Sequence, residues 1–149
     1  MEQLPFILAY VGMAIMLTVA GIGSAVGVTI GGNAAVAGLK KNPNIFGSAM
    51  ILCALPSTQG LYGFAGFFLM LQQLKGAETL SMNAALAMCA AGIATGVVGY
   101  FSAVKQAKLV ANGINEMANG NNVFVNTMIL AVFPELYAIL AFAASFLSL

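Results

Sequence analysis

Glu135 is the residue whose chemistry most needs an explanation, because it is a lone acid in a long apolar segment. In a helix it would lie about twelve residues, or roughly 18 Å, from the nearest polar turn. If that segment crosses a membrane, an ionised carboxylate there is costly, and such acids usually belong to functional sites. The alternative is an acid that stays protonated and bonds a neighbouring carbonyl. Glu135 is therefore the first candidate for a binding site.

Oxygen-bearing side chains elsewhere are predicted to lie at the same depth. One set follows the spacing i, i+3, i+4, i+7, which places its members on one face of a helix; they are Leu55, Thr58, Gln59 and Tyr62. Gln59 and Gln106 each stand about thirteen to fourteen helical residues from their own polar turns, close to the depth of Glu135. Three helices should thus bring these groups together.

The predicted ligand set suits a hard cation, which prefers oxygen. Pro56 removes a helical N–H, so backbone carbonyls just before it can leave the helical ladder. The oxygens available are the Leu55 carbonyl, Thr58, Gln59, Gln106 and Glu135. A single negative charge favours a monovalent ion of sodium size over Ca²⁺ or Mg²⁺, with H⁺ as the alternative. We expect Tyr62 to donate its hydroxyl to Glu135. The other interpretation is that these groups only hold helices together.

Composition places these residues in a membrane protein. Of the 149 residues 61% are hydrophobic and 6% charged, and the mean hydropathy is +0.98. Soluble domains carry about a quarter charged residues. Apart from Glu135, four uncharged runs are long enough to cross a bilayer: 3–39, 42–74, 79–104 and 117–149. The expected fold is an all-α membrane protein of four transmembrane helices.

Polar turns divide the chain into helices expected at 5–39, 45–74, 80–117 and 123–149, with Thr79 as an N-cap. Lys40, Lys41, Lys105 and Lys108 lie on the side of the first and third turns, which the positive-inside rule assigns to the cytoplasm. Lys105 is nearly as deep as Gln106, and the sequence offers no firm account of it. Both deeper lysines could line a wide interior or extend toward the surface.

The two halves resemble each other, which predicts a duplicated helical hairpin with units at 1–75 and 76–149. Ile51-Leu52-Cys-Ala-Leu-Pro56 matches Ile129-Leu130-Ala-Val-Phe-Pro134, and Ala20-Gly21-Ile22 matches Ala91-Gly92-Ile93. Keeping both matches requires about seven extra residues in the third helix, close to two turns. Chance similarity of apolar stretches is the alternative. The second unit alone would carry the ion-binding acid.

A stripe of small residues, Gly23, Gly27, Gly31 and Ala35, lets another helix approach the first closely. Packing within one bundle would explain it, but its length favours a crowded inner layer made of many copies of the helix.

Other functions are excluded or disfavoured by the composition. The chain has no histidine, its net charge of +1 offers no surface for nucleic acid, and Cys53 and Cys89 fit small buried apolar residues. No catalytic residue or cofactor site is predicted.

Taken together, the motifs resemble the four-helix proteolipid, the rotor-ring subunit, of V-type ATPases, particularly the bacterial sodium-translocating kind. The motifs are Gly-Ile-Gly-Ser-Ala-Val-Gly at 21–27, Leu-Pro-Ser-Thr-Gln-Gly-Leu-Tyr-Gly-Phe at 55–64, Gln106, and Phe-Pro-Glu-Leu-Tyr at 133–137. The glycine motif alone is weak, but the second and last together are specific. The resemblance covers essentially the whole chain.

The resemblance implies a closed ring of identical copies in a bacterial plasma membrane, with the first and third helices inside. It implies a stator subunit with an arginine, central-stalk subunits, and ATP hydrolysis by separate soluble subunits, so this chain is no enzyme. Its sodium-binding members use residues that match Leu55, Thr58, Gln59, Gln106 and Glu135, with Tyr62 supporting the acid. Ser57 stands where the first hairpin would carry an acid, so one ion per four helices is expected.

Two other classes of function remain open at this stage. A secondary transporter or small channel built from a repeat would also contain an intramembrane acid and broken helices. Ion flux through the purified chain alone would favour it. A purely structural membrane scaffold predicts instead that Glu135 can be replaced by leucine without loss of function.

Overall fold

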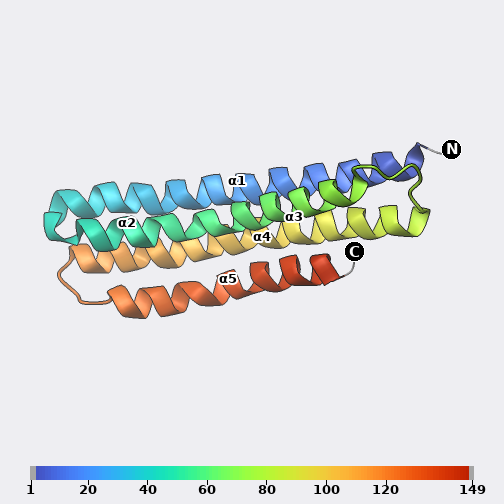
Figure 1. Ribbon diagram of the computed structural model, residues 1–149. Helices are drawn as coiled ribbons and strands as arrows, with labels where there is room; N and C mark the ends of the chain where they lie inside the picture. Colours follow the sequence, from blue (N-terminus) through green and yellow to red (C-terminus); the bar gives the residue numbers. More distant parts are fainter. Residues whose placement is uncertain (1–2, 148–149) are drawn as a thin grey trace.

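The computed structural model describes residues 3–147, and this part of the chain contains helices and turns but no strand (Figure 1). The helical elements in chain order are α1 (Leu4–Lys41), η1 (Pro43–Ile45), α2 (Phe46–Ala54), η2 (Leu55–Ser57), α3 (Thr58–Leu74), α4 (Met82–Ala118) and α5 (Phe124–Leu147). The helices run lengthwise beside one another. Both hairpin turns lie at one end, and the link between α3 and α4 lies toward the other, as do the start of α1 and the end of α5 (Figure 1).

Four segments of the described chain are long and apolar enough to cross a membrane, which confirms the predicted fold class. They are Leu4–Lys41, Pro43–Leu74, Met82–Ala118 and Phe124–Leu147. The second span joins α2, η2 and α3. Large apolar side chains point outward from it and from α5, for example Leu61 at 63% exposure and Ile129 at 57%. Such a surface suits lipid, where apolar side chains lose nothing by facing outward. The chain is an integral membrane protein.

The ends of the last two helices differ from the sequence prediction. Thr79 is not the N-cap of α4; Ser81 is, and its hydroxyl accepts a hydrogen bond from the Ala84 N–H at 3.2 Å. Leu80 lies outside the helix and packs on the apolar cluster around the start of α1 and the end of α3. The fourth helix is described to Leu147, so the predicted last two residues lie outside the described part.

The extra residues predicted for the third helix lie on its side toward the hairpin turn, although its total length hardly differs from that of the first helix. α4 has 37 residues, whereas α1 has 38. α4 has fewer helical residues before Gly92 than α1 has before Gly21, and it has more helical residues between its glycine and the hairpin turn. The seven additional residues are therefore balanced by a later start.

α1 and α4 make the most extensive helix contact in the molecule, and the glycine stripe explains why. A Cβ on Gly23 would collide with the Tyr100 backbone, and one on Gly27 would lie 3.0 Å from the Ala103 carbonyl oxygen. Gly31 similarly adjoins α2. The stripe thus packs within one chain, which corrects the interpretation that it serves contacts between copies. Glycine is needed here because backbone meets backbone.

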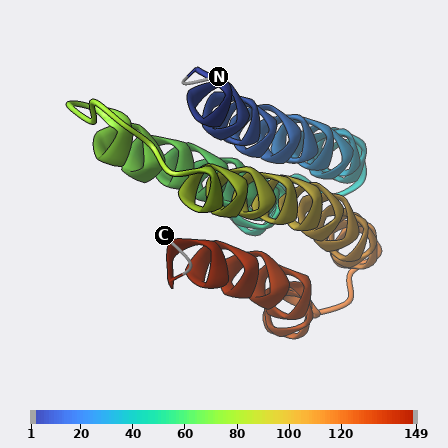
Figure 2. The ribbon, with the colours of Figure 1, turned by 90° about the vertical axis from the view of Figure 1, so that its right-hand side faces the viewer.

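The outer helices pack on this pair. α3 contacts α1, α4 and α5, and α5 packs mainly along α4 (Figure 2). The second span is broken at η2, where Pro56 cannot donate a backbone N–H and the chain tightens into a 3₁₀ turn. The break falls at the residues predicted to expose carbonyls. It separates α2 from α3 at the level of the predicted site.

Candidate ion-binding site

Glu135 lies on α5, half-buried, with both carboxylate oxygens bonded by side chains from other helices. The Tyr62 hydroxyl on α3 donates to Oε1 at 2.9 Å. The Gln106 amide nitrogen on α4 donates to Oε2 at 3.1 Å. Hydrogen bonds to a charged acceptor are stronger than neutral ones, so two such donors stabilise a carboxylate inside the protein. The predicted bond from Tyr62 to Glu135 is therefore present.

The two glutamines are fully buried and bonded to each other. The Gln59 amide nitrogen donates to Gln106 Oε1 at 3.0 Å and to Ser102 Oγ at 3.0 Å. The Gln106 amide nitrogen also donates to the Ala131 carbonyl on α5 at 2.9 Å. Buried amides are costly unless paired, and these contacts pair both of them. The glutamines from α3 and α4 thus meet at the level of Glu135.

Thr58 and Leu55 form the remaining side of the cluster. The Thr58 hydroxyl lies 3.0 Å from the Leu55 carbonyl oxygen and 3.3 Å from Gln59 Oε1. The hydroxyl has a single proton, so these two acceptors compete for it. The Thr58 backbone N–H also donates to the Leu55 carbonyl across η2. The 3₁₀ turn therefore brings a main-chain oxygen, a hydroxyl and an amide oxygen together.

Every residue of the predicted ligand set belongs to one connected hydrogen-bond network. Its members are Leu55, Thr58, Gln59, Tyr62, Gln106 and Glu135. Hydrogen bonds link the Leu55–Thr58–Gln59 group to Glu135 through Gln106.

Ser102 and Ser24 complete the site, and sequence reasoning missed both. Ser102 Oγ accepts from Gln59 and donates to the Pro134 carbonyl at 2.7 Å, so it ties α3 to α5 through α4. Ser24 Oγ on α1 accepts the Gly60 N–H at 2.7 Å. Ser102 stands four residues before Gln106, on the same helix face. That spacing was the available signal, whereas nothing local marked Ser24.

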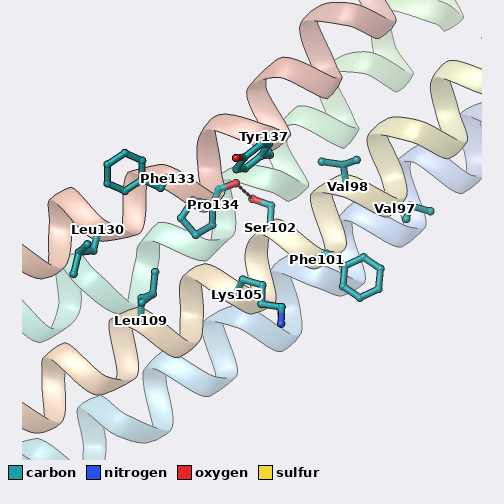
Figure 3. A pocket seen from close by; sticks show the side chains of 10 residues that line it. All are labelled: Val97, Val98, Phe101, Ser102, Lys105, Leu109, Leu130, Phe133, Pro134 and Tyr137. Carbon is teal, nitrogen blue, oxygen red and sulfur yellow. Dashed lines mark hydrogen bonds between the residues drawn. The ribbon is translucent and has the colours of Figure 1, made fainter.

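Lys105 does not join the site, although it precedes Gln106 in the sequence. Gln106 is fully buried, whereas Lys105 and Lys108 are exposed on α4. Figure 3 shows the Lys105 ammonium directed away from Pro134 and Tyr137. A helix turns by about 100° per residue, which separates neighbours in sequence onto different faces. Lys105 is therefore outside the hydrogen-bond network, and Glu135 is the charged residue within it.

The network offers several oxygens and a single formal negative charge. Among the described residues no group of three or more histidine, cysteine or acidic side chains could hold a metal ion. Divalent hard cations usually recruit several carboxylates. One carboxylate with neutral carbonyl, hydroxyl and amide oxygens instead balances a monovalent cation. The donor set thus fits a monovalent cation better than calcium or magnesium.

Comparison with known proteins identifies the family. The model of the family formed by the C subunits of ATP synthase matches the chain twice, over residues 11–70 and 89–148. The chain belongs to this family. The double match agrees with a duplicated hairpin. It also confirms the resemblance to rotary ATPase proteolipids that the motifs indicated.

Two curated relatives come from this group of proteins. The A-type ATP synthase subunit K of Methanocaldococcus jannaschii is 39% identical over 135 residues, which cover 91% of this chain and 58% of the relative. The V-type sodium ATPase subunit K of Enterococcus hirae is 39% identical over 141 residues, covering 95% of this chain and 89% of the relative. The chain thus spans little more than half the length of the archaeal relative.

Proposed function

We propose that this chain is an ion-carrying rotor subunit of a V-type ATPase that binds one Na⁺ at Glu135. The observation that carries the proposal is the position of this acid. It lies within a transmembrane helix, and side chains from two other spans donate to its two oxygens at 2.9 and 3.1 Å. Placing an ionisable side chain at this depth raises the free energy of the folded protein in the membrane, which favours a functional role for Glu135.

The proposed ligands are the Leu55 carbonyl, Thr58, Gln59, Gln106 and Glu135. Tyr62 acts on the opposite carboxylate oxygen and keeps the acid oriented toward the ion. A dehydrated alkali ion needs several oxygens in place of its water, and this network supplies them from three spans. Support for sodium comes from this number of oxygens and from the sodium ATPase named among the relatives. H⁺ remains the alternative cargo, since it would need only the carboxylate and an acceptor.

Transport follows from charge neutralisation in the proposed ring of identical copies. An ionised Glu135 resists entry into lipid, but a bound cation makes the site nearly neutral and lets it turn through the bilayer. At a stator subunit, an arginine would weaken the bound ion and allow exchange with water. ATP hydrolysis in separate soluble subunits would drive rotation through a central stalk. This chain itself is proposed to catalyse no reaction.

The proposed orientation in the plasma membrane places both hairpin turns in the cytoplasm. Lys40 and Lys41 at the first turn support it, since basic residues favour the cytoplasmic side. The link between α3 and α4 would then face outward. The hairpin units 1–75 and 76–149 would meet at the ion site, with the acid in the second unit.

Carbodiimide labelling of Glu135 in the assembled complex tests the proposal. Carbodiimides modify protonated carboxyl groups, so a bound Na⁺ should protect Glu135 at alkaline pH. We expect labelling to fall as Na⁺ is added, whereas K⁺ at equal ionic strength should protect less. Labelling that ignores Na⁺ would leave H⁺ as the cargo. Full ATP-driven transport by a labelled ring would overturn the rotor proposal itself.

A further inference from the structure

Ser102 is a buried serine on α4 whose hydroxyl touches the ion site without being one of the proposed ligands. Its side chain is 6% exposed. The hydroxyl oxygen accepts a hydrogen bond from the Gln59 amide nitrogen at 3.0 Å and donates one to the Pro134 carbonyl at 2.7 Å (Figure 3). Ser102 and Pro134 also line a groove of about 620 Å³ between α4 and α5. The two residues form the wall between this groove and the buried glutamines.

The direction of the hydrogen bonds at Ser102 follows from its partner on α5. A backbone carbonyl can only accept a hydrogen bond, so the single hydroxyl proton of Ser102 is committed to the Pro134 oxygen. Toward Gln59 the serine can then only accept. The amide atom of Gln59 that faces Ser102 must be the nitrogen, because an amide oxygen there would meet the serine oxygen with no proton between them.

Gln106 engages the other amide proton of Gln59 by the same logic. The Gln106 nitrogen donates to the Ala131 carbonyl and to the Glu135 carboxylate, which are both acceptors. The Gln106 oxygen is therefore turned toward Gln59 and accepts from its nitrogen at 3.0 Å. Both amide protons of Gln59 are thus engaged, and its oxygen lies on the side of Thr58, 3.3 Å from that hydroxyl.

We propose that Ser102 is a positioning residue for sodium binding, which holds the Gln59 amide so that its oxygen faces the ion. The inference rests on the proposed function of the Glu135 site and adds a residue that does not itself contact the ion. A ligand that is ordered before the ion arrives lowers the free energy cost of binding. Residues that orient metal ligands in this way typically change metal affinity by about 10- to 100-fold when they are replaced.

The proposed role predicts that Ser102 affects the ion and the acid differently. The hydrogen bonds to the Glu135 carboxylate come from Tyr62 and Gln106, whereas Ser102 bonds Gln59 and Pro134. Removing the Ser102 hydroxyl should therefore weaken Na⁺ binding while the surroundings of the carboxylate stay as they are. A serine that only held α4 against α5 would behave otherwise, because loosening these helices would also disturb the bond between Gln106 and Glu135.

Carbodiimide labelling of Glu135 in the assembled complex tests this difference with Ser102→Ala. We expect the Na⁺ concentration that half-protects Glu135 at alkaline pH to rise about 10-fold. The rate of labelling without Na⁺, at the same pH, should match that of the wild type. An unchanged half-protecting concentration would overturn the inference, and so would a labelling rate without Na⁺ that changes as much as the protection does.

Ser145→Ala is the matched control, because Ser145 is a second buried serine that ties the same two helices together. Its hydroxyl on α5 donates to the Ala91 carbonyl on α4 at 3.1 Å and lies 2.7 Å from the Thr95 hydroxyl. Neither partner belongs to the ion-binding network. We expect sodium protection of the Ser145 variant to equal that of the wild type. A similar rise in the half-protecting concentration for both serine variants would reduce Ser102 to a contact between helices.

Ser102→Cys separates hydrogen bonding from packing and does not depend on how well the alanine variant assembles. Cysteine nearly keeps the volume of serine, but its thiol is a weak donor and a weak acceptor. We expect the half-protecting Na⁺ concentration to rise as it does for Ser102→Ala. Protection equal to that of the wild type would show that the shape of the side chain is sufficient, which would overturn the inference.

The wild-type complex separates this inference from the proposed function. Protection of the wild type by Na⁺, together with equal protection of both Ser102 variants, would refute the positioning role alone. Absence of Na⁺ protection in the wild type would refute sodium binding at Glu135 and the role of Ser102 with it.

Discussion

The two hairpins share an ancestor in sequence but supply different parts of the site. The first hairpin contributes neutral oxygens and a hydroxyl donor, through Thr58, Gln59 and Tyr62. The second contributes the acid and the amide that holds it, through Glu135 and Gln106. Duplication therefore allowed specialisation. The position in the first hairpin that matches Glu135 is occupied by Ser57, so the junction between the hairpins contains a single acid.

The paired prolines show the same divergence in the backbone. Pro56 breaks its span into a 3₁₀ turn, whereas Pro134 lies inside the continuous helix α5. Pro56 is buried against Gly27 of α1, whose missing side chain makes room for the displaced turn. Pro134 is only half-buried and borders the open groove. The same residue thus gives different local structure because the packing partners differ.

The largest expected effect comes from removing the charge that distinguishes the second hairpin. Glu135→Gln should abolish ATP-driven Na⁺ uptake by vesicles containing the complete complex, because the site loses its only negative charge. Glu116→Gln, on the exposed end of α4, is the matched control and should leave uptake unchanged. Undiminished uptake by the Glu135 variant would refute the proposed mechanism.

The second-largest effect is expected from removing the Gln106 side-chain amide, which links the two hairpins. Gln106→Leu removes the donor to Glu135 and the acceptor for Gln59. Contacts to charged groups contribute about 1.5–3 kcal/mol, so the Na⁺ concentration that half-protects Glu135 from carbodiimide should rise about 10- to 100-fold. Gln72→Leu, exposed near the end of α3, controls for the loss of a glutamine. An unchanged half-protecting concentration would remove Gln106 from the ligand set.

The packing between hairpins should respond to single methyl groups. Gly23→Ala places a Cβ against the Tyr100 backbone, which cannot move aside as a side chain could. We expect the free energy of unfolding in detergent to fall by about 1–3 kcal/mol. Gly21→Ala meets nothing within 4 Å and should be neutral or stabilising by up to about 1 kcal/mol. Thermal circular dichroism measures both, and equal stabilities would contradict the close contact.

The smallest effect is expected from removing the Tyr62 hydroxyl, which donates a hydrogen bond from the first hairpin to Glu135. Tyr62→Phe removes one hydrogen bond to Glu135 but keeps the ring, which stacks on Phe142 with centroids 6.0 Å apart. A cation beside the carboxylate offsets its charge, so the hydrogen bond from Tyr62 is close in strength to a neutral one. Its removal should weaken the free energy of Na⁺ binding by about 1 kcal/mol, or roughly fivefold in Na⁺ affinity. Tyr10→Phe, half-exposed on α1, should have no effect on sodium protection. Equal loss in both variants would assign the effect to general damage.

Several features of the site followed from residue spacing. The positions of Leu55, Thr58, Gln59 and Tyr62 on one helix face required only a period of 3.6 residues, and equal distances from polar turns set their depth beside Gln106. The partners with no local signal were missed. Ser24 bonds the Gly60 N–H across two helices that the sequence alone does not orient. The N-cap of α4 is Ser81 rather than Thr79, and the neighbouring Leu80 packs on an apolar cluster formed by residues distant in sequence.

The sequence by itself determined that the chain has four segments able to cross a membrane and that Glu135 needs oxygen-bearing groups around it at that depth. Hydropathy and helical period depend only on residue type and order, so no tertiary information was required for either. Tertiary structure decided which helices touch. It placed the glycine stripe against α4 of the same chain, directed the Lys105 ammonium away from Pro134 and Tyr137, and brought Ser102 into the network. Those outcomes depend on the rotation of each helix about its axis, which packing alone sets.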